Sequence, residues 1–239
     1  MTISLYPEIQ KAGSLKRAIN DALEEAGSPL RASGYEGITK LPFAYARVQN
    51  ENRFSQIYIA AEEKLYLFDF WRDGVCLAHA RIEDLNLLAQ CLQCWLVAKP
   101  NTSQLAVAFN FVTPNKGATF FDEGKEVAYN WDVILHDHGR KEIRPFVALA
   151  IKDEVLSKLF PYTSLMTLCF SRCTGYPYTT DTPTVTPNIK SKQFIVRNGK
   201  GVEIGSGSAR EALQIVKTHL PKDIAPAVKG TAETYKNHT

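Results

Sequence analysis

The fold of this chain is decided by residues 43–80, which read FAYARVQNENRFSQIYIAAEEKLYLFDFWRDGVCLAHA. Four runs in this stretch are rich in Tyr, Phe, Ile and Val, and they span residues 43–49, 54–61, 64–72 and 75–80. Short polar connectors separate these runs, and Asp73-Gly74 suits a type I′ turn because both central residues of that turn need a positive φ. The stretch therefore predicts a four-stranded antiparallel meander.

Apolar residues at helical spacing flank this meander on both sides. They predict helices over residues 14–26, 85–96 and 127–135, and a shorter helix over residues 153–160 that Pro161 ends. Residues 105–112 fit a helix and a strand almost equally well. The first helix is expected to cover one face of the sheet, because its apolar residues form a single stripe.

The later part of the chain combines strand, loop and hairpin patterns. Residues 165–172 alternate apolar and polar side chains and predict a strand, whereas residues 174–188, with three prolines and six threonines, predict an extended loop without regular structure. Residues 193–197 and 202–205 flank Asn198-Gly199 and predict a second hairpin. Ser208 and Glu211 form a capping box before a helix that ends at Pro221.

Strand runs are grouped apart from helix runs, which indicates an α+β fold. We expect an antiparallel meander of about four strands with packed helices, followed by a C-terminal strand–hairpin–helix unit. No internal repeat and no flexible or charged linker divides the sequence, so residues 1–239 are expected to form a single domain. Residues 222–239 lack an apolar period and are expected to be a partly ordered tail.

Length and composition exclude several classes of protein. The 239 residues carry 28 basic and 25 acidic side chains, a net charge of +3, and 45% of them are hydrophobic, so wholesale disorder is excluded. No apolar run is long enough to cross a bilayer, and no membrane partner is expected. The basic residues after position 185 are dispersed, so no nucleic-acid partner is expected.

The cysteines raise the questions of disulfides and zinc. An odd number, five, in a chain of this size argues against a disulfide framework, and the first residues show no secretory signal, so a cytoplasmic location is expected. Cys91-x-x-Cys94, together with Cys169 and Cys173, offers four thiols to a metal. The first pair falls in the middle of a predicted helix, however, where burial in the core is the better interpretation.

Two further patterns contain residue types that can bind a metal ion or a phosphate group. His136-Asp137-His138 lies at a predicted helix end, where a basic residue interacts favourably with the helix dipole, and too few ligands accompany it for a metal site. Residues 205–208, GSGS, lack the Lys-Ser/Thr pair of a phosphate-binding loop, so a turn followed by a helix cap is the better interpretation. Neither a metal nor a cofactor is expected.

Cys173 is the candidate nucleophile of the sequence. It follows Arg172 at the end of a predicted strand, and a positive charge beside a thiol lowers its pKa. Successive strand residues point to opposite faces, so adjacency in sequence does not itself provide that contact. His136 and His138 are the candidate bases, and the sequence contains no Gly-x-Ser-x-Gly elbow.

Residues 170–183, FSRCTGYPYTTDTP, have the makeup of a recognition loop. Tyr176 and Tyr178 supply rigid contact surface, and the prolines reduce the entropy that is lost on ordering. Arg172 can bind a carboxylate or phosphate through two parallel hydrogen bonds. With Asp181, these residues form the candidate ligand-binding set, and the alternative is a packed surface loop whose rings cover the core.

Four short stretches carry a resemblance to a known family: residues 70–75, 159–164, 170–179 and 226–233. In them the chain resembles an uncharacterised bacterial family whose members are labelled natural-product biosynthesis proteins. The resemblance implies a single-domain cytoplasmic protein associated with biosynthetic clusters. It brings no active site, no cofactor and no residue role, because such a label reflects association.

Hypotheses of different classes follow from these observations. The first is a non-catalytic binding or accessory protein that presents Arg172, Tyr176 and Tyr178 to a small molecule, a peptide or a biosynthetic partner protein. The alternative is a transferase or hydrolase with Cys173 as nucleophile and one of the two histidines, His136 or His138, as base. A structural homo-oligomer is the third.

Overall fold

The computed structural model of the protein describes residues 5–34 and 45–236, and it confirms an α+β fold. The chain forms two compact units, Met1–Asp122 and Glu123–Thr239, each with its own hydrophobic core. The sequence suggested a single domain because no flexible or charged linker divides it. The boundary between the units instead falls within a helix, α5 (Ala118–Glu123), whose sequence has no linker composition.

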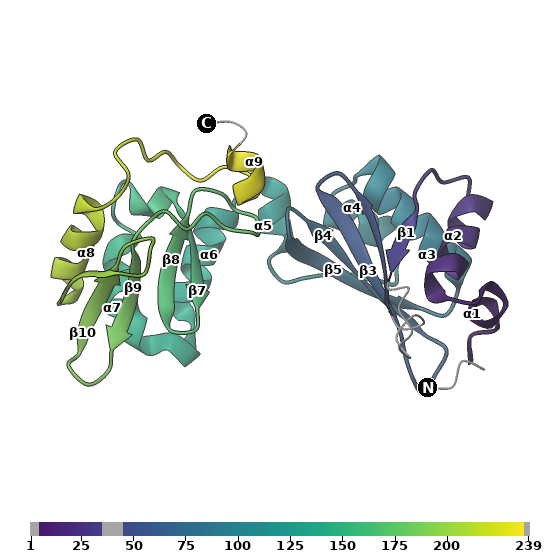
Figure 1. The fold of residues 1–239 in the computed structure, drawn as a ribbon, viewed down its shortest axis with the longest axis horizontal. Coiled ribbons are helices and arrows are strands. Elements are labelled where there is room, and N and C mark those ends of the chain that lie inside the picture. The colour runs from purple at the N-terminus through teal and green to yellow at the C-terminus, as the bar shows by residue number, and fades with distance from the viewer. Residues whose placement is uncertain (1–4, 35–44, 237–239) are drawn as a thin grey trace. The chain divides into compact units, whose positions relative to one another are not determined.

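The first unit contains a six-stranded antiparallel sheet (Figure 1). Its strands run in chain order as β1 (Ala32–Gly34), β2 (Tyr45–Asn50), β3 (Arg53–Ile59), β4 (Tyr66–Arg72), β5 (Val75–Ile82) and β6 (Val112–Pro114). The predicted meander is therefore confirmed as β2 to β5, and short strands extend it at both edges. The first two residues of the predicted strand 43–49 lie outside the described part of the chain.

The turn between β4 and β5 has the predicted conformation. Asp73 has φ 52° and Gly74 has φ 71°, as the two central positions of a type I′ turn require. These two residues are the whole connection between β4 and β5. A connection this short fixes which residues of the two strands face each other.

Helices cover one face of this sheet (Figure 1). They are α1 (Pro7–Ala12), α2 (Leu15–Glu25), α3 (Leu85–Gln93) with its π-helical continuation η2 (Cys94–Ala98), and α4 (Thr102–Ala108). Ser14 caps α2 by accepting a hydrogen bond from the Arg17 amide, which confirms the predicted start. The ambiguous run 105–112 divides into the end of α4 and the start of β6, and Asn101 forms a capping box with Gln104 before α4.

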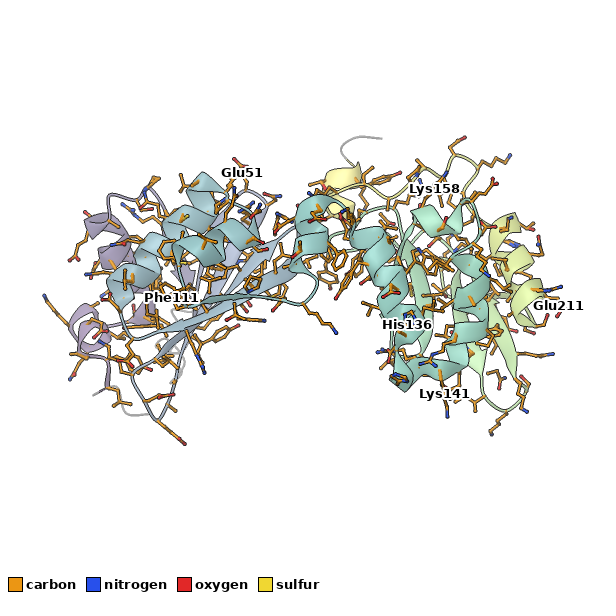
Figure 2. All side chains as sticks on the ribbon, turned by 180° about the vertical axis from the view of Figure 1, so that it is seen from behind. Glu51, Phe111, His136, Lys141, Lys158 and Glu211 are labelled. Atoms are coloured by element: carbon orange, nitrogen blue, oxygen red, sulfur yellow. The ribbon has the colours of Figure 1, made fainter. Side chains whose placement is uncertain are left out.

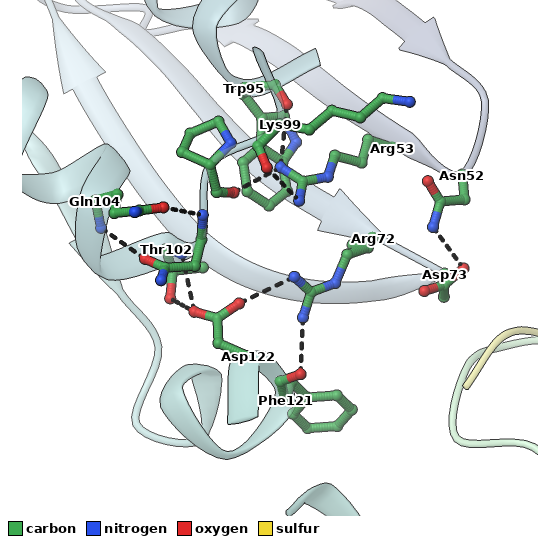
Figure 3. Close-up of polar contacts among 12 residues, drawn as sticks. Asn52, Arg53, Arg72, Asp73, Trp95, Lys99, Thr102, Gln104, Phe121 and Asp122 are labelled. Atoms are coloured by element: carbon green, nitrogen blue, oxygen red, sulfur yellow. Dashed lines mark hydrogen bonds and ion pairs between the residues drawn. The ribbon is translucent and has the colours of Figure 1, made fainter. Parts of the chain in front are cut away.

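A buried polar network ties these helices to the start of β3 and the end of β4, the two central strands of the sheet (Figure 3). Arg53 is 6% exposed, and its guanidinium donates to the carbonyl of Trp95 in η2 and to those of Lys99 and Pro100, which directly follow η2. Burial lowers the pKa of Arg53 to about 10, and the charge of Arg72 adds to this shift.

Arg72 continues the network toward the following helices. It pairs with Asp122 at 2.9 Å, and the other oxygen of that carboxylate accepts from the Thr102 amide at 2.9 Å. Arg72 also donates to the Phe121 carbonyl at 3.0 Å. The cations of β3 and β4 thereby fix the start of α4 and the end of α5.

The second unit packs helices on a five-stranded antiparallel sheet, whose order is β11-β10-β9-β8-β7. The strands are β7 (Phe160–Ser164), β8 (Thr167–Ser171), β9 (Thr184–Asn188), β10 (Gln193–Arg197) and β11 (Glu203–Gly207). The helices are α6 (Glu126–His136), the 3-10 turn η3 (His138–Ile143), α7 (Arg144–Ala150), the 3-10 turn η4 (Leu156–Lys158), α8 (Ala209–Thr218) and α9 (Ala232–Lys236). Trp131, Phe146, Phe170 and Phe194 are the large rings of its core.

The predicted helix over residues 153–160 is wrong. Asp153 Oδ1 accepts from the amides of Val155 and Leu156, so the chain forms only the single turn η4, and Phe160 already begins β7. Pro161 lies inside that strand instead of ending a helix. A proline is tolerated there because β7 is an edge strand.

The predicted loop over residues 174–188 is wrong at its end. Residues Thr184–Asn188 form β9, which pairs along its whole length with β10 but meets β8 only where Val185 faces Leu168. Because one side of β9 is nearly unpaired, the strand accommodates Pro187. The proline and three polar residues hid the strand pattern of the sequence.

The predicted hairpin at Asn198-Gly199 has a longer connection than two residues. Strand β10 ends at Arg197 and β11 begins at Glu203, and the positive φ of the turn, 80°, falls on Gly201. Asn198 Oδ1 accepts from the amides of Lys200 and Val202, which organises this turn. The capping box of Ser208 and Glu211 before α8 is confirmed.

Candidate binding groove

The loop that follows β8 is closed on a buried serine. Ser171 Oγ donates to the Cys173 carbonyl at 2.7 Å and accepts from the amides of Cys173, at 3.0 Å, and Thr179, at 3.2 Å. Thr179 Oγ1 in turn accepts from the Arg172 amide at 2.9 Å. The two arms of the loop are thereby held together, because these backbone groups find their partners inside the loop.

The tail of the chain runs alongside this loop and binds it through the backbone. Hydrogen bonds run from the Val228 amide to the Arg172 carbonyl, from the Thr174 amide to the Val228 carbonyl and from the Ala232 amide to the Pro177 carbonyl. The sequence predicted a partly ordered tail over residues 222–239. The structure describes it up to Lys236, and α9 is its last described element.

Tyr178 anchors the loop in a group of aromatic rings. Its ring stacks on Tyr162 with the centroids 4.2 Å apart, and Phe160 and Tyr176 approach it at 5.6 and 5.7 Å. Burial raises the pKa of Tyr178 above its ordinary value, so the hydroxyl remains neutral. Tyr176 lies on the outside of this group and is 62% exposed.

Arg172 links both ends of the loop to α9. Its Nη2 pairs with Asp181 Oδ2 at 2.8 Å, and its Nη1 donates to the Tyr235 hydroxyl at 3.2 Å. The Arg172 side chain is 13% exposed, whereas that of Asp181 is 50% exposed. The guanidinium is therefore nearly covered, while the carboxylate that neutralises it stays in contact with water.

A groove of about 790 Å³ lies between the loop, the β10–β11 turn and α9. Its lining includes Arg172, Tyr178, Asp181, Lys200, Tyr235 and Lys236. Three of these side chains are cationic and one is acidic, so the groove carries a positive balance. Hydroxyl groups of Thr179, Thr180 and Tyr235 add hydrogen-bonding capacity.

The β10–β11 turn approaches the loop closely at Gly199. A Cβ at this position would lie 2.5 Å from the Thr180 carbonyl oxygen and 3.1 Å from the Asp181 Cα. Both neighbours are backbone atoms, so they cannot turn aside as a flexible side chain does. Gly199 is therefore needed for close approach, and this contact forms one wall of the groove.

Residues 125–231 match the model of a family described as a family of unknown function, DUF6193. The match lies within the second unit: it starts next to α6 and ends just before α9. It therefore includes the loop, its aromatic group and Val228 of the tail, whereas Ala232 and Tyr235, which also bind the loop, lie beyond it. No curated protein and no solved structure matches the chain.

The structure brings three of the four predicted ligand-binding residues to one place. Arg172, Tyr178 and Asp181 line the groove, whereas Tyr176 only borders the ring of Tyr178. Sequence reasoning missed the walls that the β10–β11 turn and α9 supply. The turn had a signal in Asn198-Gly199, but nothing in the sequence around Tyr235 and Lys236 pointed to a site.

The proposed nucleophile and bases are not assembled among the described residues. Cys173 is fully buried, and its sulfur lies 3.3 Å from Ser171 Oγ. His136 bonds to Asp132, and His138 lies against Arg144. Figure 2 shows His136 and Lys141 near one end of the unit and Lys158 near the other. The Lys158 carbonyl accepts from the Ala227 amide, and the neighbouring Val228 amide donates to the Arg172 carbonyl, next to Cys173.

The thiols considered for zinc are divided between the two units. Cys91 is fully buried in the first core and Cys94 is half-buried beside it, and burial raises the pKa of both thiols. Cys169 and Cys173 are buried in the second unit.

No helix of the described residues has the length and apolar character needed to cross a membrane.

Proposed function

We propose that the unit Glu123–Thr239 is a binding module that takes a small molecule or short peptide with an acidic group in the groove beside Arg172. The observation that carries this proposal is the convergence of Arg172, Lys200 and Lys236 on one open groove of about 790 Å³. A cavity of this size matches the range of about 300–1,000 Å³ that small-molecule sites occupy.

The charges of the groove favour an anion. Lys200 and Lys236 are exposed, so their ammonium groups can move toward a bound carboxylate or phosphate. Arg172 is held in a fixed position by Asp181 and Tyr235, and a fixed donor loses little entropy on binding. Such a groove therefore selects for an acidic group that lies between the fixed guanidinium of Arg172 and the mobile ammonium groups of Lys200 and Lys236.

The aromatic ring of Tyr178 favours a ligand with a flat or apolar part next to the acidic group. Natural-product intermediates often combine such parts, and the sequence resemblance makes them the compounds to screen first. The same groove accepts the side chain or C-terminus of a peptide, so short acidic peptides belong in the screen. A binding or accessory role needs no reacting group, in agreement with the burial of Cys173.

Binding is tested on the full chain with phenyl phosphate, 4-hydroxybenzoate and the peptide acetyl-Tyr-Asp as probes. Amide chemical shifts report the affinity of each probe and where it binds. Replacing Lys200 and Lys236 together by Ala is expected to weaken the best probe about tenfold, because each removed charge forfeits a charge-assisted contact. Both side chains are exposed, so the variant is expected to fold.

A matched control replaces Lys190 and Lys222, two exposed lysines of the same unit outside the groove lining, by Ala. It removes the same charge and is expected to leave the affinity unchanged. Equal losses in both double variants would mean that only the net charge attracts the probes. Failure of all three probes to shift amides around residues 172–181 would overturn the proposed module.

A further inference from the structure

The sheet of the first unit contains a β-bulge between β4 and β5. Phe70 pairs with Ala78 and Trp71 pairs with Cys76, so Leu77 is an extra residue in β5. Side chains alternate along a regular strand, and Cys76 and His79, three positions apart, would then point to opposite faces. The extra residue puts both on the same face of the sheet.

Asp69 completes a group of three possible metal ligands. It pairs directly with His79 across β4 and β5, and one ligand atom from each of Asp69, Cys76 and His79 lies within 4.8 Å of the other two. Cys76 Sγ is 3.8 Å from His79 Nε2 and 4.0 Å from Nδ1. A tetrahedral zinc ion holds sulfur and nitrogen ligands about 3.6 Å apart, so only small side-chain movements are needed.

Neighbouring residues hold two of these groups in place. The Gln56 amide donates to Asp69 Oδ1 at 3.1 Å, and a carboxylate has a second oxygen for a metal. Asn115 Nδ2 lies 2.9 Å from the Cys76 carbonyl oxygen and 3.6 Å from its sulfur. Hydrogen bonds of this kind orient metal ligands and raise affinity.

The group also borders an opening. Asp69 and His79 line a groove of about 390 Å³, together with Tyr58, Arg81 and Thr113 among others. His79 is exposed, so an ion can reach it. Three protein ligands with one open position are the arrangement of zinc sites that bind water or another molecule, whereas purely structural sites are closed by four protein ligands.

We propose that Asp69, Cys76 and His79 bind one Zn²⁺ ion, with the fourth position open toward this groove. One thiolate, one imidazole and one carboxylate are ligands that zinc prefers in proteins. Binding converts the Cys76 thiol to a thiolate, and its proton passes to the buffer. The site belongs wholly to the first unit, so it stands independently of the groove beside Arg172.

Cobalt(II) replaces zinc as a coloured probe for the test. Titrating the full chain with Co²⁺ is expected to produce a thiolate-to-cobalt charge-transfer band and intense visible bands of a tetrahedral ion, and Zn²⁺ is expected to displace both. Cys76→Ser and His79→Ala are expected to weaken Co²⁺ binding by at least about tenfold. Loss of a residue that only hydrogen-bonds to a metal ligand already lowers metal affinity by that much. His79 is exposed and Cys76→Ser is conservative, so both variants are expected to fold.

Cys94→Ser and His219→Ala serve as matched controls, because they remove the same residue types from positions outside this group. Circular dichroism verifies the fold of all variants. Absence of a charge-transfer band in the wild type would overturn the site, and so would a band that survives Cys76→Ser. A band lost in Cys94→Ser but kept in Cys76→Ser would place the metal elsewhere and would overturn it as well.

Discussion

Asp181 neutralises Arg172 from the far end of the same loop, with 2.8 Å between Oδ2 and Nη2. The carboxylate therefore occupies the donor that an acidic ligand needs in the groove. Because the Asp181 side chain is half exposed, water already weakens this ion pair. In the proposed module, an acidic ligand would compete with Asp181 for Arg172, while the hydrogen bond to Tyr235 continues to hold the guanidinium in position.

Asp181→Asn is expected to strengthen binding of phenyl phosphate by about threefold to tenfold, because it removes the competing charge and leaves the loop in place. Amide chemical shifts measure the affinity. Asp223→Asn, an exposed residue outside the groove lining, is the control for net charge. An unchanged or weaker affinity in Asp181→Asn would show that the guanidinium of Arg172 only supports the loop.

Ser171→Ala is expected to destabilise the second unit by about 2–3 kcal/mol, because the amides of Cys173 and Thr179 lose their buried acceptor. Urea unfolding monitored by tryptophan fluorescence measures the change, with Trp131 reporting on the second unit and Trp71 and Trp95 on the first. Ser206→Ala, at an exposed position of β11, is the control and is expected to change the free energy of unfolding by less than about 0.5 kcal/mol. Equal effects of the two substitutions would contradict the role of Ser171.

The ion pair between Asp153 and Lys217 is expected to make stability depend on pH. Burial alone raises the pKa of Asp153, but hydrogen bonds from Lys217 and from the amides of Leu156 and Val155 outweigh it, so the pKa lies below its ordinary value. A lowered pKa contributes stability above the unfolded-state value of about 3.9, and the contribution disappears as pH falls through the folded-state value.

Asp153→Asn is therefore expected to cost about 1 kcal/mol near neutral pH and almost nothing in acid, because the amide keeps an acceptor for the two backbone groups but loses the charge. The free energies of unfolding of the wild type and the variant are measured between pH 7 and pH 3. These two pH values lie above and below the unfolded-state pKa of about 3.9. A penalty that is independent of pH would assign the loss to packing instead of charge.

Arg53→Lys is expected to destabilise the first unit by about 2–3 kcal/mol, although it keeps the positive charge. Lysine has one ammonium group and cannot bond to the carbonyls of Trp95, Lys99 and Pro100 with the geometry of the guanidinium. It also loses the stacking of Arg53 over the Trp95 ring, at 4.0 Å from the centroid. Urea unfolding followed by tryptophan fluorescence measures the effect, because two of the three tryptophans, Trp71 and Trp95, lie in this unit.

Arg47→Lys is the matched control, because Arg47 also stacks on a ring, that of Phe54, but donates to the exposed side chain of Gln49. Its free energy of unfolding is expected to change by less than about 1 kcal/mol. If both substitutions cost the same, the carbonyl contacts of Arg53 contribute nothing specific.

The strands and helices with a single clear period could be predicted from the sequence. Alternation and the Asp73-Gly74 turn gave β2 to β5, and the Ser208–Glu211 capping box gave α8. The elements that were missed depend on contacts that are distant in sequence. Strand β9 contains Pro187 and forms because β10 pairs with it, and the division into two units is invisible where α5 joins them without a linker.

The candidate sites show the same limit. Composition located the loop and its Arg172, Tyr178 and Asp181, but the walls of the groove come from a turn and a helix that follow much later in the chain. The possible zinc ligands were not recognised at all, because their spacing is meaningful only with the bulge at Leu77. A one-residue irregularity in strand pairing cannot be read from alternation, which assumes that pairing is regular.

Val228 and Ala232, which hydrogen-bond to the loop, are synthesised about fifty residues after it, so these bonds form late in the synthesis of the unit. While the ribosome is still adding residues 226–236, the sheet and the helices that support the loop have already been synthesised, yet one side of the loop backbone lacks its partners. Tyr235 and Lys236 are the last contributors to the groove to leave the ribosome. The groove of the nascent chain is therefore complete only after Tyr235 and Lys236 have been added.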